Sequence, residues 1–114
     1  MAESTSFWDE LAIQSYKTIL KQKPEHPVIH HNLGLAYVRT GDLKKAASSF
    51  RKATRYDKSY AEAYYHLATT LQRLGNSASA IRAFGHYNRI QSERRESTPI
   101  VAEMLSRLNI ETGG

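Results

Sequence analysis

Histidine is the residue type in this sequence with the clearest capacity for chemistry. There are five: His26, His30, His31, His66 and His86. His26 and His30 are four residues apart, a spacing that puts two imidazoles on one helical face, but Pro27 interrupts the helix that would do so. The chain has no cysteine, which excludes disulfides and thiolate metal ligands. We therefore expect structural or surface histidines and no metal site.

Motifs of catalysis are also missing from the sequence. It contains no glycine-rich phosphate loop, no Gly-x-Ser-x-Gly elbow and no His-Glu-x-x-His. Asp9 and Glu10 are neighbouring acids near the start of a predicted helix, where carboxylates cap it and complement its dipole. We expect a protein that is not an enzyme, with no catalytic residue and no cofactor.

The composition suits one small domain in the cytoplasm. The chain has 114 residues, of which 40% are hydrophobic, and a formal net charge of +5. No apolar run approaches the length of a membrane span, and the first ten residues do not form a secretory signal. The charge favours acidic partners weakly. Met1 and the capped ends suit a complete chain, but the sequence does not say whether it is a whole protein or a region of a larger one.

Two short helices in residues 32–53 organise the chain. Gly41-Asp42 separates them, since glycine accepts the left-handed conformation that ends a helix and aspartate caps the next one. The apolar stripes are Leu33, Ala36, Tyr37 and Thr40 on the first helix, and Leu43, Ala46, Ala47, Phe50 and Ala53 on the second. Such a pair is too short to be stable alone, so it should fold as a hairpin with apolar surface left to cover.

The pattern repeats along the chain with a fixed period of about 34 residues. Leu33, Leu67 and Val101 are in phase, as are Tyr37, Leu71 and Leu105, Gly41, Gly75 and Asn109, Ala12, Ala46 and Ala80, and Tyr16, Phe50 and Phe84. A fixed period with large and small apolar residues in phase is typical of stacked helix pairs, each covering its neighbour.

At these positions the chain resembles the tetratricopeptide-repeat (TPR) family, whose pattern is W-x2-L-G-x2-Y, then A-x3-F, then P. The first unit has His30 in place of the tryptophan, then Leu33, Gly34, Tyr37, Ala46 and Phe50, with Lys58 in place of the proline. The second unit has Tyr64, Leu67, Ala68, Leu71, Ala80 and Phe84, and the N-terminal part has Ala12, Tyr16 and Pro24.

The expected fold is all-α: a short α-solenoid of antiparallel helix pairs with about five helices and half units at both ends. It is one domain, 1–114, made of an N-terminal half unit (7–26), a first repeat (27–60), a second repeat (61–94) and a C-terminal capping helix (95–112). The first helix should run from about 7 to 21 with Ser6 as its cap and an apolar stripe of Trp8, Leu11, Ala12, Ser15 and Ile19. Ser97 or Thr98 should cap the last helix. Gly85 lies inside a helix, where close approach of a neighbouring helix would explain it.

The resemblance implies a site on the concave side of the solenoid, lined by the first helix of each unit. Carried onto this chain, the family's ligand-facing positions include His31, Asn32, Leu35, Val38, Arg39, Glu62, Tyr65, His66, Thr69, Gln72, Arg73, Glu103 and Arg107, with Val28, Glu96, Pro99 and Ser106. This mixture suits a partner peptide or helix held by apolar anchors and hydrogen bonds. We therefore expect a non-catalytic protein–protein interaction scaffold or adaptor.

Some TPR proteins clamp the C-terminal carboxylates of chaperones with lysines, asparagines and an arginine. Here only Asn32 falls on such a position, and Glu62 and His66 stand where basic residues are required. We do not expect this protein to bind a chaperone tail.

Two further surfaces are also candidates for binding. The basic residues Lys44, Lys45, Arg51, Lys52, Arg55, Lys58, Arg82 and Arg89 fall on the second helices, but we expect a protein rather than a nucleic-acid partner. Phe7, Trp8 and Leu11 belong to a helix without its usual partner and could mediate self-association. The alternative function is therefore a self-assembling module, a homo-oligomer within a larger complex.

Overall fold

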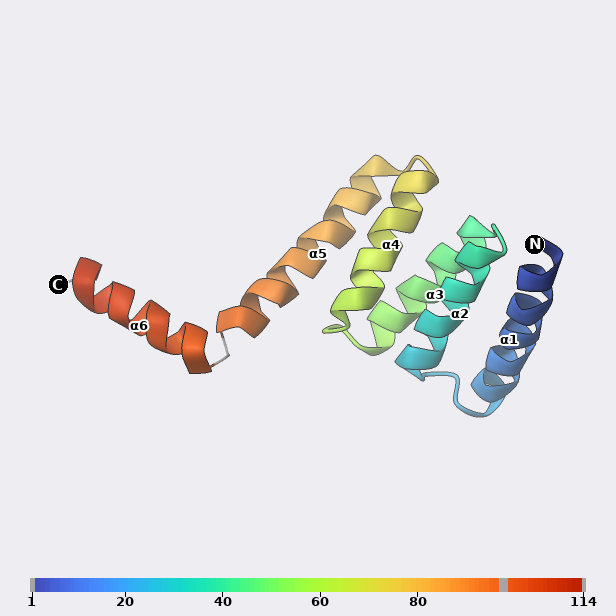
Figure 1. Cartoon of the computed structure of the whole chain (residues 1–114), viewed down its shortest axis with the longest axis horizontal. Helices are drawn as coiled ribbons and strands as arrows, with labels where there is room; N and C mark the ends of the chain where they lie inside the picture. The colour runs from blue at the N-terminus through green and yellow to red at the C-terminus, as the bar shows by residue number, and fades with distance from the viewer. Residues whose placement is uncertain (1, 97–98, 114) are drawn as a thin grey trace.

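The protein is a row of antiparallel helices (Figure 1). A computed structural model describes residues 2–96 and 99–113, which contain α-helices and no strand. The helices are α1 (Ala2–Gln22), α2 (Pro27–Arg39), α3 (Leu43–Tyr56), α4 (Ala61–Arg73), α5 (Ser77–Glu96) and α6 (Pro99–Gly113). The predicted all-α class of stacked helix pairs is confirmed. The described residues form six helices rather than about five, because two complete pairs and one helix at each end make six. None of them is both long and apolar enough to cross a membrane.

The turns between paired helices form as the sequence predicts. Gly41 and Gly75 have φ values of +84° and +83°, which end α2 and α4 in the left-handed conformation. The N–H of Asp42 reaches back to the carbonyl of Tyr37 over 2.9 Å, and its own carboxylate accepts from the N–H of Lys45 at the start of α3. The N–H of Asn76 likewise reaches back to the carbonyl of Leu71 over 2.9 Å, and its side-chain amide oxygen accepts from the N–H of Ser79 in α5. These short turns hold each pair antiparallel.

Phe50 occupies the centre of the core. Its side chain is completely buried and packs against the Gly34 position of α2, where an added Cβ would lie only 2.5 Å from the Phe50 ring. The in-phase residues Tyr16 and Phe84 are partly buried against the same core. Gly85 differs: a Cβ there would meet nothing within 4 Å, so no close helix approach explains it.

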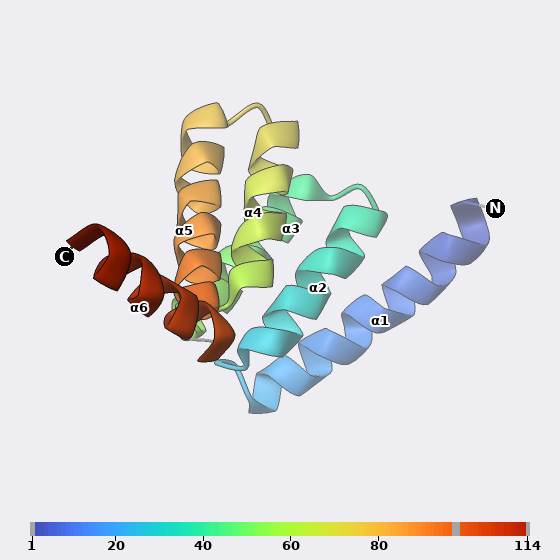
Figure 2. The same cartoon turned by 60° about the vertical axis from the view of Figure 1, so that its left-hand side comes forward.

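The row curves because its two sides are packed differently. Within the described residues, α2 contacts α4, whereas α1 does not reach α3 and α3 does not reach α5. α2 and α4 therefore form the inner side of the curve and α1, α3 and α5 the outer side, and Figure 2 shows α1 to α5 fanning out in this way.

The exposed face of α1 differs from the prediction. This helix begins at Ala2, so Ser6 lies inside it and is not its cap. Its buried face carries Asp9 and Ile13, whereas the predicted stripe of Trp8, Leu11, Ser15 and Ile19 is exposed. The prediction was wrong because the helix has two apolar stripes and only one of them packs on α2.

The last helix starts one turn later than the repeat period implies. α4 begins at Ala61, but α6 begins only at Pro99, because α5 continues through the charged segment as far as Glu96. Glu96 therefore ends α5, and the counterpart of Leu67 is Leu105 rather than Val101. The shift is one helical turn, so Glu103 and Arg107 still fall on positions equivalent to inner-side positions of α4. The predicted cap at Ser97 or Thr98 lies outside the described residues.

Candidate protein-binding surfaces

The predicted concave residues fall on three helices. Five lie on α2 (His31, Asn32, Leu35, Val38, Arg39), six on α4 (Glu62, Tyr65, His66, Thr69, Gln72, Arg73) and two on α6 (Glu103, Arg107). Since α2 and α4 are in contact, the first two groups share the inner side of the curve. α6 projects away from α5 in Figure 1, so its two residues are not brought to this face.

A cluster of rings joins α2 to α4 at the inner side. His31 stacks obliquely on His66 with ring centroids 5.2 Å apart, and both rings lie near Phe50. His31 Nδ1 shares a 3.0 Å hydrogen bond with the Tyr60 hydroxyl. With only 8% of its surface exposed, His31 serves the packing of the two repeats and offers a ligand very little.

The environment keeps this pair of histidines neutral at pH 7. Burial lowers the pKa of His31 to about 4, and the nearby His66 adds to this because two imidazolium charges would repel each other. Burial also lowers the pKa of His66, and Glu62 opposes that shift. This pair of histidines therefore adds no positive charge to the inner face.

These shifts predict a loss of stability on acidification. In the unfolded chain His31 protonates near pH 6.5, whereas in the folded protein it stays neutral down to about pH 4. The unfolded state thus binds more protons across this window, and about 3 kcal/mol of stability should be lost between pH 7 and 4. Thermal unfolding across that range measures it. His31→Gln, which can still accept from Tyr60, should flatten the fall, while the exposed His86→Gln should not.

Tyr65 is the most prominent aromatic side chain of the inner face. It is 43% exposed, yet its ring is held by edge and tilted contacts to His66, Phe84 and Tyr87. An exposed ring fixed in this way loses little conformational entropy when it binds a partner, which is why tyrosines often anchor interfaces.

Ion pairs occupy both ends of the inner face. Arg39 donates from Nε to Asp9 Oδ1 over 2.7 Å, and Asp9 is buried. Glu62 lies 3.7 Å from Arg94. The sequence predicts only a capping role for Asp9. Its contact with Arg39 joins residues far apart in the chain and lies on a face of α1 that the apolar pattern predicts to be exposed.

The two ends of the row carry exposed apolar side chains. Phe7, Trp8 and Leu11 are exposed on α1, with the Phe7 and Trp8 rings in edge contact at 5.2 Å. On α6, Ile100, Met104, Leu105 and Leu108 are exposed. The residues predicted for self-association are therefore accessible, and α6 adds a second apolar face that the sequence reasoning did not assign.

Known proteins match these repeats in sequence. Family models described as tetratricopeptide repeat match residues 10–54 and 61–93, and one described as TPR repeat matches residues 36–75. The TPR repeat-containing thioredoxin TTL4 of Arabidopsis thaliana is 34% identical over 71 residues, 62% of this chain and 10% of that protein. Tetratricopeptide repeat protein 28 of Mus musculus is 32% identical over 73 residues, 64% of this chain and 3% of that protein. This chain thus spans a small part of either relative.

Solved structures share the fold at low sequence identity. MamA matches with a TM-score of 0.73 and 17% identity, over 75% of this chain and 50% of that chain. The second TPR of Spaghetti (RPAP3), bound to the HSP90 peptide SRMEEVD, matches with a TM-score of 0.69 and 20% identity, over 78% of this chain and 91% of that chain. With the repeat matches running from residue 10 to 93 and the helix pairs in phase, this chain belongs to the tetratricopeptide-repeat family.

Proposed function

We propose that this protein is a non-catalytic scaffold that binds a peptide or helix of another protein on the inner face formed by α2 and α4. The observation that carries the proposal is Tyr65, an exposed ring held in place beside the contact between the two repeats. A structural neighbour, the second TPR of RPAP3, is a peptide-bound example of the same fold, which supports a peptide-binding role here.

The chemistry of the inner face suggests the kind of segment that fits. Leu35 and Val38 are half-buried, and Asn32 and Thr69 add neutral polar groups beside them. Arg39 is engaged by Asp9 and the histidines are neutral, which leaves Arg73, exposed at the end of α4, as the main cation of this face. This face suits a segment with an apolar or aromatic anchor and backbone hydrogen bonds, rather than an acidic tail.

The test is a single substitution at Tyr65. Affinity purification with the intact chain identifies partners, and Tyr65→Ala should weaken their binding by about tenfold or more, as expected for an aromatic anchor. The loss of its contacts to His66, Phe84 and Tyr87 should lower the melting temperature by a few degrees, so binding is measured well below the transition, where the variant is fully folded.

Ile81→Ala is the matched control. It removes an exposed apolar side chain from α5, on the outer side, and should leave binding unchanged. Retention of every partner by Tyr65→Ala would reject the inner face as the binding site.

A second candidate function, self-assembly, is favoured by the two ends of the row. In repeat register α1 corresponds to α3. Ser49 and Ala53 are buried in α3, whereas their equivalents Ser15 and Ile19 are exposed on α1, where the described residues provide no helix in the position of α2.

α6 resembles the helix that would cover this face. It reads PIVAEMLSRLNIETG where α2 and its turn read PVIHHNLGLAYVRTG, with Leu105 in the place of buried Leu33 and Leu108 in the place of buried Ala36. We propose that α6 of one copy packs on α1 of the next and completes a repeat between them. Such a head-to-tail contact leaves one free α1 and one free α6 at the ends of each assembly, so it would add further copies into a row or a ring.

A further inference from the structure

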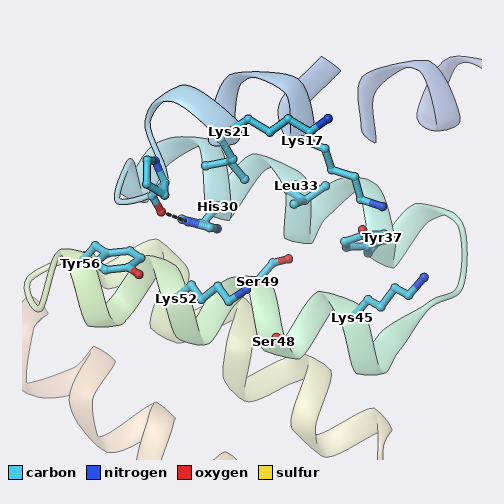
Figure 3. Close-up of a pocket in the computed structure, with 12 residues that line it drawn as sticks. Lys17, Lys21, His30, Leu33, Tyr37, Lys45, Ser48, Ser49, Lys52 and Tyr56 are labelled. Carbon is cyan, nitrogen blue, oxygen red and sulfur yellow. Dashed lines mark hydrogen bonds between the residues drawn. The ribbon is translucent and has the colours of Figure 1, made fainter. Parts of the chain in front are cut away.

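A cleft lies on the outer side of the curve, between α1 and α3. It measures about 520 Å³ and has side chains of α2, among them Leu33 and Tyr37, at its floor (Figure 3). The cleft exists because α1 and α3 both pack on α2 without reaching each other. None of the predicted inner-face residues lines it.

Lysines stand on both walls of this outer cleft. Lys17 and Lys21 come from α1, and Lys45 and Lys52 come from α3, as Figure 3 shows, and no lining residue is acidic. Lys45 has Asp42 at 3.6 Å as a counter-charge. Among the described residues the other three lysines form no ion pair. Like charges facing one another across a cleft raise its potential and favour an anion between them.

The equivalent cleft of the next repeat is smaller and carries fewer positive charges. It lies between α3 and α5 and measures about 240 Å³. It keeps two cations, Arg51 and Arg82, but its positions equivalent to Lys45 and Lys52 hold Ser79 and His86. The first cleft is thus larger and has four cations on its walls, whereas the second has two.

We propose that the outer cleft binds an acidic peptide segment of a partner protein, with carboxylates along its length and an apolar side chain between them. Lys45 and Lys52 are seven residues apart on α3, about 10 Å along the helix. Cations spread over this length match a series of carboxylates better than one phosphate group. Leu20 of α1, which is only partly buried, and Tyr56 of α3, which is 37% exposed, offer apolar surface to the side chain of such a segment.

The rings of the cleft argue against a nucleic acid. Single-stranded nucleic acids are held by bases stacked on exposed aromatic faces. The Tyr37 ring is buried, with Lys45 Nζ 5.8 Å from its centroid, and the Tyr56 ring packs beside His30 at 5.5 Å. Tyr56, 37% exposed, is the one lining ring that a base could reach, so the cleft supplies positive charge without a series of stacking rings.

The probe that tests this proposal is a fluorescein-labelled peptide of sequence Glu-Glu-Leu-Glu-Glu-Leu-Glu-Glu, titrated with the intact protein and followed by fluorescence anisotropy. We expect saturable binding that weakens as salt is added. The same peptide with glutamine for every glutamate should not bind. Lys17→Glu combined with Lys52→Glu, one change on each wall, should weaken binding at least tenfold.

The matched control is Lys44→Glu combined with Lys58→Glu. It makes the same change of net charge at exposed lysines that do not line the outer cleft, and should change affinity less than about threefold. Equal losses in the two double variants, no binding of the acidic peptide, or equally tight binding of an oligo-dT strand would each overturn the proposal. Tyr65→Ala should bind the peptide normally, which separates this site from the inner face.

Discussion

Phe50→Ala is expected to lower the free energy of unfolding by about 4 kcal/mol, the usual cost of deleting a fully buried phenylalanine ring. Phe50 is completely buried and joins the core of both repeats, so the cavity cannot collapse easily. Domains of this size are stable by only about 5–15 kcal/mol, so the loss should be visible as a large fall in the denaturation midpoint. Chemical denaturation followed by circular dichroism measures it.

A double-mutant cycle with Gly34 shows whether the ring is the cause. Gly34→Ala should destabilise the native protein by about 2 kcal/mol, because its Cβ would lie 2.5 Å from the Phe50 ring. In the Phe50→Ala background the same change should stabilise by up to about 1 kcal/mol, since alanine is the better helix former. Gly85→Ala, in open space, should stabilise in both backgrounds. A Gly34→Ala effect of the same sign and size in both backgrounds would contradict this account.

Head-to-tail assembly predicts that two variants, each unable to assemble, will pair with each other. Leu11→Glu with Ile19→Glu alters the exposed face of α1, and Leu105→Glu with Leu108→Glu alters that of α6. In sedimentation velocity the unaltered protein should grow in mass with concentration, and each double variant alone should be monomeric. Their mixture should form a one-to-one complex, because the intact α6 of one variant meets the intact α1 of the other.

The alternatives give different patterns. A symmetric contact of α1 with α1 would be abolished by the α1 double variant and not by the α6 double variant. The two variants would then form no complex with each other. Trp8, the one tryptophan of the chain, is 66% exposed and reports the association through a blue shift of its fluorescence. A protein that stays monomeric at every concentration would reject the self-assembly proposal.

The features of this fold that could be predicted from sequence are those set by local chemistry and by repetition. Gly41-Asp42 and Gly75-Asn76 are sufficient to end one helix and start the next. The repeat period identified the core, because Phe50 and its in-phase counterparts pack against one cluster.

The features that the sequence predicted wrongly, or did not predict, depend on contacts between distant parts of the chain. The segment around Arg94 and Glu96 contains charged residues that form helices well, so α5 continued through it and moved α6 by one turn. On α1, two apolar stripes compete, and only the position of α2 decides which is buried. His31 was expected on the inner face from a family position, but its burial results from three rings supplied by α3, α4 and the turn before α4. The lysines of the outer cleft come from α1 and α3, which both pack on α2 without touching each other. The spacing of residues along the sequence does not show that these lysines face one another.

The pattern of helix contacts also bears on how the molecule forms. Apart from α2 and α4, each described helix touches only its immediate neighbours along the chain. Native contacts therefore require little loop closure, and folding can spread outward from any pair that forms first. The terminal helices have a neighbour on one side only, so they should detach first and rejoin last, while the central pairs stay assembled. A partner that binds α1 or α6 would therefore stabilise the helices that unfold most readily.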